Sequence, residues 1–251
     1  MLKTLSPKFK YTYSYAKPHA MTSVIVPRKV EGQVTSIGPI VFTYDNNGNL
    51  LTSNQLSNTW NYDNRLTQTV SDGVTTTYTY DPNGQRIKTV TPTLTTIYPT
   101  KYYNKEGSTD VKHIYANDML IATVRGTGTN AVVSYIHTDH LNSTDKVTNA
   151  NAEISELSDY YPYGSPRIST TYSGSSEQRK YIGQEYDTST SLSYLNARYY
   201  DSNRGQFLGV KGDSHHCFQI WSMIKLNYAT KCESRCWKRN ISYNKSCKWS
   251  S

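Results

Sequence analysis

A turn-forming pattern recurs along the chain and constrains its fold more than any other feature. Tyr44-Asp45, Tyr62-Asp63 and Tyr80-Asp81 are separated by two intervals of 18 residues. An aromatic residue stands two positions before each tyrosine, which places both rings on one side of an extended strand. Asp, Asn, Pro and Gly, the residues that favour tight turns, follow these pairs. Each unit therefore predicts a β-hairpin.

The chain resumes a strand-forming pattern after each turn, at Leu50, Leu66 and Ile87. Gly84 closes the third turn, whereas the middle unit has no glycine and is shorter. A repeat array tolerates such a degenerate unit because neighbouring units stabilise it. The segment 112–124 predicts a further hairpin with its turn at Asn117-Asp118.

Composition agrees with strands rather than a helical bundle. Apolar residues make up 36% of the chain, and 23 tyrosines stand against four phenylalanines and four tryptophans. Tyrosine buries a large ring while its hydroxyl still needs a polar partner, and it favours strands, as threonine does. We therefore expect an all-β protein built from thin sheets whose faces are partly polar.

These hairpin units resemble the Tyr-Asp (YD) repeats of RHS proteins and of related toxin and teneurin shells. The resemblance becomes more specific in the segment 135–154, which is similar to the D-H-L-G-S-T block of that family through Asp139, His140, Leu141, Ser143 and Thr144. Asn142 stands where the family usually has glycine. Asparagine tolerates a left-handed backbone better than other residues with a side chain, so we expect Asn142 to take that conformation.

Residues 181–208 resemble the RHS repeat-associated core signature over nearly their whole length. The signature runs G-Q-E-x-D, then L-x-Y-x-x-A-R-Y-Y-D, then a glycine and an aromatic residue. The positions that match and that we assign to the structural motif are Gly183, Gln184, Arg198, Tyr199, Tyr200, Asp201, Gly205 and Phe207. With the repeats, the resemblance covers residues 37–208.

The resemblance implies an architecture and a division of the chain. The fold class that we expect is all-β, with YD-repeat antiparallel hairpins forming part of an RHS-type shell and an irregular C-terminal tail. We expect an irregular N-terminal segment (1–36), the YD-repeat hairpins (37–134), the core-associated segment (135–208) and a divergent basic tail (209–251).

The function implied is that of a structural fragment of a toxin-delivery or cell-surface protein, without free-standing catalysis. One alternative is a carbohydrate-binding or adhesion module that displays Tyr and Asn on exposed sheet faces. Another is an aspartyl-type self-cleaving core that releases a C-terminal effector. Such chemistry needs two carboxyl groups that share a proton.

The residues that self-cleavage would use are Asp201 and Asp213, and we assign neither as catalytic. The family's second aspartate lies in an Asp-Pro element shortly after the glycine and aromatic residue, and this chain has no Asp-Pro there. Asp213 lies nearby but out of register. We expect Asp201 to cap a turn and Arg198 to pair with a carboxylate such as Asp201 or Glu185.

The remaining polar motifs favour structural roles. Asp139-His140 has no Ser or Cys nucleophile signature beside it. Asp45, Asp63 and Asp81 offer one carboxylate per turn, whereas Ca²⁺ needs six to eight oxygen ligands, so turn capping is the better interpretation. We therefore expect no metal and no cofactor.

The tail differs from the body in charge and cysteine content. Residues 209–251 contain eight Lys or Arg against two Asp or Glu, and all four cysteines of the chain. The body is close to neutral, so no nucleic-acid surface is indicated there. Among Cys217, Cys232, Cys236 and Cys247 only one pair has the spacing of a zinc knuckle, and we assign no metal. The tail reads as a small effector or as a disordered product of a shifted reading frame.

The expected partners are the rest of an RHS shell, a C-terminal toxin or its immunity protein, and cell-surface glycans. No apolar stretch is long enough to span a bilayer, and no signal peptide is evident in this chain. We expect a secreted or cell-surface location as part of a longer parent protein.

Overall fold

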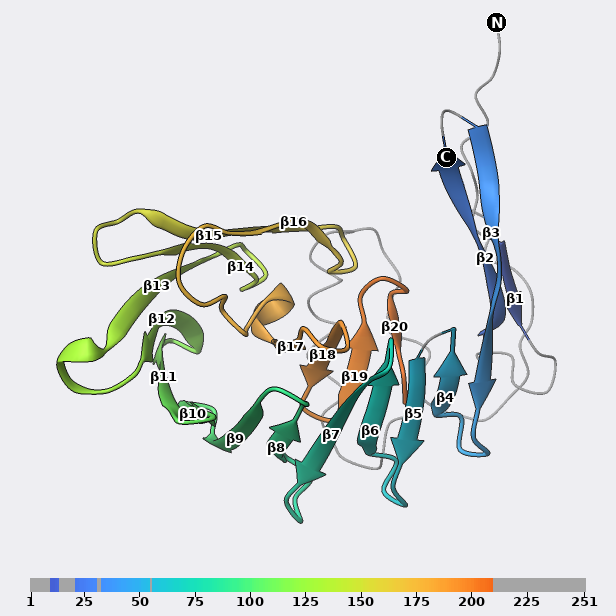
Figure 1. The fold of residues 1–251 in the computed structure, drawn as a ribbon, viewed down its shortest axis with the longest axis horizontal. Helices are drawn as coiled ribbons and strands as arrows, with labels where there is room; N and C mark the ends of the chain where they lie inside the picture. Colours follow the sequence, from blue (N-terminus) through green and yellow to red (C-terminus); the bar gives the residue numbers. More distant parts are fainter. Residues whose placement is uncertain (1–9, 14–20, 31–32, 55, 210–251) are drawn as a thin grey trace, which may run out of the picture. The chain divides into compact units, whose positions relative to one another are not determined.

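A computed structural model describes residues 10–13, 21–30, 33–54 and 56–209. In this part of the chain there is no α-helix, and sixteen strands pair in sequence order into one antiparallel sheet (Figure 1). Its first eight strands are β1 (Lys10–Tyr13), β2 (Met21–Val30), β3 (Gln33–Tyr44), β4 (Leu50–Ser53), β5 (Leu56–Trp60), β6 (Leu66–Ser71), β7 (Val74–Tyr80) and β8 (Arg86–Val90). The other eight are β9 (Thr95–Thr100), β10 (Tyr103–Glu106), β11 (Thr109–Ala116), β12 (Met119–Arg125), β13 (Val132–Thr138), β14 (Thr144–Thr148), β15 (Ile154–Tyr160) and β16 (Pro166–Thr171).

A second, four-stranded sheet follows, made of β17 (Glu185–Asp187), β18 (Leu192–Leu195), β19 (Arg198–Asp201) and β20 (Gln206–Phe207). Two short 3₁₀ turns lie at Gly128–Asn130 and Tyr181–Gly183. The all-β prediction is confirmed. The hairpin expected in 112–124 is also present, because β11 pairs with β12 around Asn117 and Asp118, both with positive φ.

The large sheet crosses two of the expected boundaries. β13 spans the junction between the segments 37–134 and 135–208. β1, β2 and the start of β3 lie in residues 1–36, where the sequence suggested an irregular segment. The run Thr22-Ser-Val-Ile-Val26 is rich in β-branched residues, which accounts for a strand there. The tail from residue 210, with Asp213 and the four cysteines, lies outside the described residues.

Six turns of the large sheet share one geometry. In each, the first residue's N–H donates to the fifth residue's carbonyl, and the fourth residue's N–H donates to the first residue's carbonyl. The turns span residues 45–49, 61–65, 81–85, 139–143, 149–153 and 161–165. The fourth residue has a positive φ in every copy: Gly48, Asn64, Gly84, Asn142, Ala152 and Gly164. The left-handed conformation expected for Asn142 is confirmed, at φ 64°.

The first residue of these turns uses its side chain as a cap. Asp45, Asp81 and Asp139 each accept the N–H of the fifth residue on Oδ1, at 2.8 Å in all three turns. Asn61 and Asn149 accept the equivalent N–H at 2.9 and 3.0 Å. Turn capping is therefore what the repeat aspartates at 45 and 81 do here.

The structure corrects the register of the middle unit. The first residue of its turn is Asn61, so Trp60-Asn61 takes the place of the Tyr-Asp pair, and Tyr62 and Asp63 lie inside the turn. Tyr62 is fully exposed, at 103% of its reference area. Equivalent positions are thus 44, 60 and 80, which are unequally spaced. Asn64 supplies the left-handed residue that Gly48 and Gly84 supply in the other two repeat units, and this fixes the register.

The aromatic residue before each of the turns 45–49, 61–65 and 81–85 braces the preceding unit. Trp60 Nε1 donates to the carbonyl of Leu50 at 2.9 Å, and the Tyr80 hydroxyl donates to that of Leu66 at 2.6 Å. Leu50 and Leu66 are the residues that follow the previous turns. The Tyr44 hydroxyl donates in the same way to Met21 at 2.8 Å. Consecutive hairpins are therefore joined by side chains as well as by the backbone ladder.

One face of the large sheet, the inner face, carries the buried side chains, and residues 177–208, the docked segment, pack against it. Phe42, Leu50, Leu66 and Tyr78 of the sheet form a common core with residues of the docked segment, namely Leu192, Tyr194, Tyr199 and Leu208. Figure 1 shows β17 to β20 beside the strands around β7. The Leu50 N–H donates to the Leu208 carbonyl at 2.7 Å, which ties the end of the docked segment to β4.

Much of the remaining inner face is polar. Its buried polar side chains include Asn58, Thr69, Thr76, Thr89, Asn104, His113 and Thr123. Several of them bond to the docked segment, as Thr76 does with Ser189 at 3.1 Å between the two hydroxyl oxygens. Polar groups placed in this way must find matching partners, and those partners define the candidate site.

Candidate functional site: a buried charge cluster

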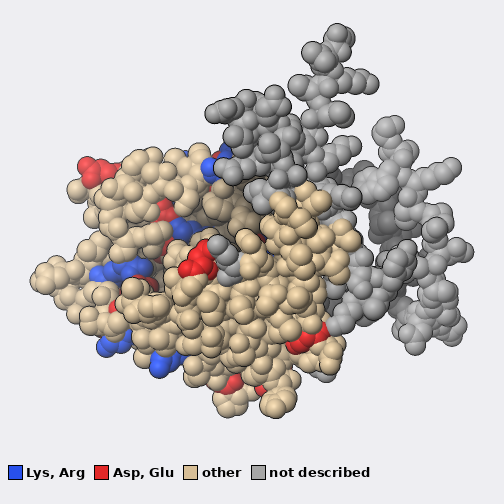
Figure 2. Space-filling model, turned by 45° about the vertical axis from the view of Figure 1, so that its right-hand side comes forward, with Lys and Arg blue, Asp and Glu red and all other residues tan. Residues whose placement is uncertain are grey.

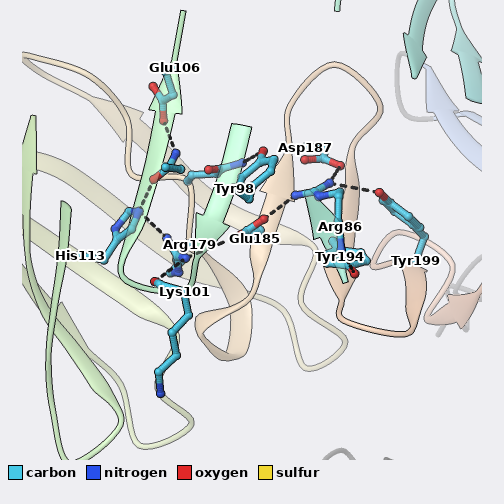
Figure 3. Close-up of polar contacts among 12 residues, drawn as sticks. Arg86, Tyr98, Lys101, Glu106, His113, Arg179, Glu185, Asp187, Tyr194 and Tyr199 are labelled. Carbon is cyan, nitrogen blue, oxygen red and sulfur yellow. Dashed lines mark hydrogen bonds and ion pairs between the residues drawn. The ribbon is translucent and has the colours of Figure 1, made fainter. Parts of the chain in front are cut away.

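Arg86 is the centre of a charge cluster between the repeats and the docked segment (Figure 3). It follows the turn 81–85 directly, and its side chain has no exposed area. The guanidinium donates to Asp187 Oδ2 at 2.6 Å and to Glu185 Oε2 at 2.5 Å. Both carboxylates come from β17, in the G-Q-E-x-D part of the signature. The cluster therefore joins residues about one hundred positions apart in the sequence.

Tyrosine rings enclose the Arg86 guanidinium. The rings of Tyr98 and Tyr194 lie 4.7 and 4.4 Å from it, centroid to Cζ, and the guanidinium donates to the Tyr199 hydroxyl at 3.1 Å. Aromatic faces attract a cation, most strongly where water is excluded. The abundance of tyrosine in the chain thus serves, in part, to house a buried arginine.

Burial and charge pairing oppose each other in this cluster. Burial opposes the charge of Arg86, but nearby groups led by Asp187 outweigh it and keep the pKa of Arg86 well above its usual value. Burial raises the pKa of Asp187, and Arg86 works against that rise. Burial also raises the pKa of Tyr98 and Tyr194, each to about 12. The cation and the carboxylates depend on one another, because either would be costly to bury alone.

A second arginine extends the cluster toward β11. Arg179 Nη2 lies 3.2 Å from Glu185 Oε1, so Glu185 contacts both buried arginines. Arg179 Nη1 lies 2.8 Å from Nε2 of His113. His113 Nε2 is also 2.5 Å from Asn104 Oδ1, and its Nδ1 is 3.3 Å from Thr123 Oγ1. Burial, followed by the charges of Arg179 and Arg125, lowers the pKa of His113 to about 3.

Glu156 and Lys180 form the third part of the cluster. The Lys180 ammonium pairs with Glu156, and both side chains are nearly buried. Glu156 also accepts hydrogen bonds from the Ser158 hydroxyl at 3.0 Å and from the Glu177 backbone N–H at 2.8 Å. Burial lowers the pKa of Lys180 to about 8, which leaves it charged at neutral pH beside this carboxylate.

Asn104, His113 and Thr123 follow one another like the members of a hydrolase triad, but the surroundings do not suit catalysis. Thr123 is 2% exposed, and its hydroxyl donates to Glu177 Oε2 at 2.7 Å. A general base with a pKa of about 3 is poorly matched to neutral pH. The arrangement positions the docked segment rather than activating a nucleophile.

The D-H-L-N-S-T block lies beside the start of the docked segment. The Thr144 hydroxyl donates to the Arg179 carbonyl at 2.7 Å, and the Ile182 N–H donates to the Ser143 hydroxyl at 3.1 Å. Gly183 has a positive φ, and a Cβ there would lie 3.3 Å from the Asn142 carbonyl. Gln184 closes this turn by accepting the Lys180 N–H on its carbonyl. Two sequence motifs some forty residues apart thus form one contact.

Asp139 and His140 have different roles, one in capping a turn and the other at the surface. Asp139 accepts the backbone N–H groups of Leu141 and Ser143 on Oδ1, both at 2.8 Å. His140 is exposed. The geometry gives this pair a capping aspartate and a surface histidine.

Asp201 is held by Arg204 and by the turn that it caps. Its Oδ1 accepts the N–H groups of Asn203 and Arg204, and its Oδ2 lies 2.6 Å from Arg204 Nε. A hollow of about 500 Å³ lies beside it, with Phe42 and Leu192 in the apolar part of its lining. Within the described residues, the charged partner of Asp201 is the guanidinium of Arg204. Asp213 lies outside the described residues.

The rest of the signature packs around β19. Arg198 lies over the ring of Phe207, 3.6 Å from the centroid, while the carboxylates considered for it are held by other arginines. Tyr199 is buried in the core, and the Tyr200 hydroxyl donates to the Tyr163 carbonyl at 3.0 Å. A Cβ on Gly205 would contact the Tyr163 ring.

Sequence reasoning missed the residues at the centre of this site. Glu185 and Asp187 lie within the motif that was identified, but Arg86, Arg179, His113 and Glu156 were not singled out. The available signal was weak: Arg86 is a charged residue directly after a repeat turn, at a position where the other two units have the apolar Leu50 and Leu66.

The described residues contain no group of three or more His, Cys, Asp or Glu that could hold a metal ion. They also contain no helix long and apolar enough to cross a membrane. On the face shown in Figure 2, lysine and arginine side chains form small groups, some of them beside acidic residues, rather than one continuous basic surface.

The family model described as Teneurin YD-shell matches residues 31–227, more than half of the chain. The chain belongs to the Teneurin YD-shell family. This confirms the YD-repeat assignment and places both the hairpins and the docked segment within the region that the family shares.

Curated relatives of this YD-shell chain are much longer. It is 25% identical over 217 residues to the "tRNA3(Ser)-specific nuclease WapA" of Bacillus spizizenii and 26% identical over 226 residues to the "tRNA nuclease WapA" of Bacillus subtilis strain 168. Each match covers 80% of this chain and 9% of the relative. The chain therefore spans about a tenth of the length of these proteins.

Solved structures support the fold. The "Crystal Structure of TcdB2-TccC3" matches 80% of this chain and 12% of that chain, with a TM-score of 0.60 and 17% identity. The same complex "without hypervariable C-terminal region" matches with a TM-score of 0.56 and 17% identity. At this identity the likeness shows a shared YD-shell fold alone.

Proposed function

We propose that this YD-shell chain is a non-catalytic part of a shell wall, in which the docked segment acts as an internal brace. The observation that carries the proposal is the buried Arg86 of a repeat, held by Glu185 and Asp187 of the docked segment. Charges that are largely buried and mutually paired suit a fixed joint between two parts of a wall. They do not suit a site that must admit a substrate.

The wall would belong to a longer protein of the toxin-delivery or cell-surface kind. Its partners would be the remaining hairpins of the shell and a C-terminal toxin component, with cell-surface glycans as a further class. The nuclease names of the WapA relatives describe proteins of which this chain matches 9%. We assign that activity to parts of those proteins that this chain does not match.

A two-part assay tests the proposal. Incubating the purified chain with a mixed tRNA pool should leave the tRNA intact, because the described residues present paired charges rather than an open catalytic group. Intact mass measurement over the same period should return one species of 28.5 kDa. Cleaved tRNA would show a catalytic chain and overturn the proposal.

Self-cleavage is separated from adventitious proteolysis by Asp201→Asn. This change keeps the shape of the side chain and removes its charge. A single cut in the parent chain that disappears in Asp201→Asn, and persists in an Asp139→Asn control, would establish an autoprotease. We expect no cut in any of the three proteins, because Arg204 holds Asp201 as a paired carboxylate.

A further inference from the structure

The first part of the docked segment, Glu177–Gln184, is attached to the inner face around His113. Thr123 donates to Glu177, Arg179 reaches the imidazole, and Arg179 Nη2 also donates to the carbonyl of Lys101 at 3.3 Å. The side chain of Gln178 donates to the Tyr98 hydroxyl at 2.9 Å. β9, β11 and β12 therefore hold this stretch through contacts centred on one histidine.

His113 must be neutral for this attachment. Its side chain lies on the inner face at 4% exposure, with Arg179 Nη1 only 2.8 Å from Nε2. Thr123 donates its hydroxyl hydrogen to Glu177, so its oxygen can accept the Nδ1–H of a neutral ring. Nε2, which also lies 2.5 Å from Asn104 Oδ1, then has a lone pair that can accept the Arg179 N–H. A protonated ring has no lone pair at either nitrogen and adds a positive charge beside Arg179 and Arg125.

We propose that His113 is an acid-sensitive latch: protonation of the ring releases Arg179 and detaches residues 177–184 from β9, β11 and β12. The inference rests on the contacts of this histidine and holds whether or not the chain is a shell wall. The released stretch would uncover the polar inner face near Asn104 and Thr123, which it covers at neutral pH.

The direction of the pH effect follows from linkage. The pKa of His113 is lowered to about 3 in the attached state, whereas a solvent-exposed histidine has a pKa of about 6.5. The detached state therefore binds the proton more tightly, and detachment grows as the pH falls below 6.5. Between pH 7 and pH 5 the equilibrium constant for detachment should rise about 25-fold, since one proton is taken up.

Other ionisable groups lie around the latch, and two with a shifted pKa, Lys180 and Asp187, do not produce this effect. Lys180, with a pKa of about 8, stays charged throughout the window. Asp187, whose pKa is raised by burial, lies outside the released stretch and is paired with Arg86. Glu185, Glu177 and Glu156 also lie here, and each accepts hydrogen bonds from the segment or its neighbours; the His113→Gln variant separates their contribution from that of His113.

Hydrogen–deuterium exchange of the full chain between pH 7 and pH 5, corrected for the intrinsic pH dependence of amide exchange, tests the latch. Peptides from 177–184 should lose protection about 25-fold, while peptides from the hairpins at 50–71 should keep theirs. Protection of 177–184 that does not change with pH in the unmodified chain would overturn the proposal without any variant.

His113→Gln keeps a polar group near the imidazole position but cannot titrate, so its 177–184 peptides should show no pH-dependent loss. His137→Gln is the matched control, because His137 is exposed and contacts Thr148 within the large sheet. That control should behave as the unmodified chain does. A loss of protection in His113→Gln equal to that of the unmodified chain would assign the effect to another group and reject the latch.

Discussion

Arg86 has no exposed side-chain area, and its charge is balanced by two carboxylates from the docked segment. Removing one partner of such a buried group leaves the others uncompensated. Arg86→Ala should therefore lower the free energy of unfolding by about 3–5 kcal/mol, as measured by urea denaturation.

Arg167→Ala is the control for that loss. Arg167 pairs with Asp159, but its side chain is 57% exposed. Exposed pairs contribute about 0–1 kcal/mol, so this variant should unfold close to the parent. Equal destabilisation by the two changes would contradict the role given to Arg86.

Two glycines test what the turns require. Gly84 and Gly73 both have a φ near +80°, but a Cβ on Gly84 would overlap the Arg65 guanidinium, whereas a Cβ on Gly73 meets open space. Alanine at either site should cost about 1 kcal/mol of backbone strain. Gly84→Ala should cost about 1 kcal/mol more in thermal or urea unfolding, because Arg65 loses its bond to the Gly84 carbonyl. Equal costs would show that the contact contributes nothing.

At the scale of elements, the aromatic residues before the repeat turns join each hairpin to the preceding one through hydrogen bonds. Tyr80→Phe and Trp60→Phe each remove a donor to the strand of the preceding hairpin, at Leu66 and Leu50. Tyr80→Phe should lower the free energy of unfolding by about 1 kcal/mol, and Trp60→Phe by at least as much, since it also removes ring area. Tyr62→Phe should change nothing measurable, because Tyr62 is fully exposed. A large effect of Tyr62→Phe would restore the evenly spaced register.

Hairpins were predictable from sequence wherever the turn chemistry was local. Asn117-Asp118 and Asn142 behave as their types suggest, because the conformation of a turn is decided by a few adjacent residues. The middle unit was misplaced for the same reason. The Tyr62-Asp63 pair matched the pattern. The register is set instead by the left-handed residue of the turn, and that residue is Asn64 rather than a glycine that the sequence would reveal.

The charge cluster could not be predicted in the same way. Arg86 and Asp187 are 101 residues apart, and nothing near either residue identifies the other. The signature motif did indicate that 181–208 forms one unit. It did not indicate that the unit packs on the repeat sheet, since that depends on the inner face, which forms only when many hairpins pair.

At the scale of the whole molecule, buried tyrosines should limit stability in alkali. Burial raises the pKa of Tyr98 and Tyr194 to about 12, so their neutral forms stabilise the fold fully below pH 10, and this contribution is lost as the pH rises from about 10 to about 12. The free energy of unfolding measured in urea should therefore fall across that pH range. Tyr98→Phe should reduce the pH dependence, as followed by circular dichroism. An unchanged pH profile in that variant would place the effect on other residues.

The central claim is that the docked segment and the repeat sheet form one structural unit joined at Arg86. Hydrogen–deuterium exchange at neutral pH, comparing peptides from 185–201 with peptides from β6 to β8, tests it most directly. Both sets of peptides should show the same free energy of opening, and Arg86→Ala should lower that free energy by the same amount in each set. Rapid exchange in 185–201 while β6 to β8 stay protected would show a segment that merely rests on the sheet, and would contradict the brace.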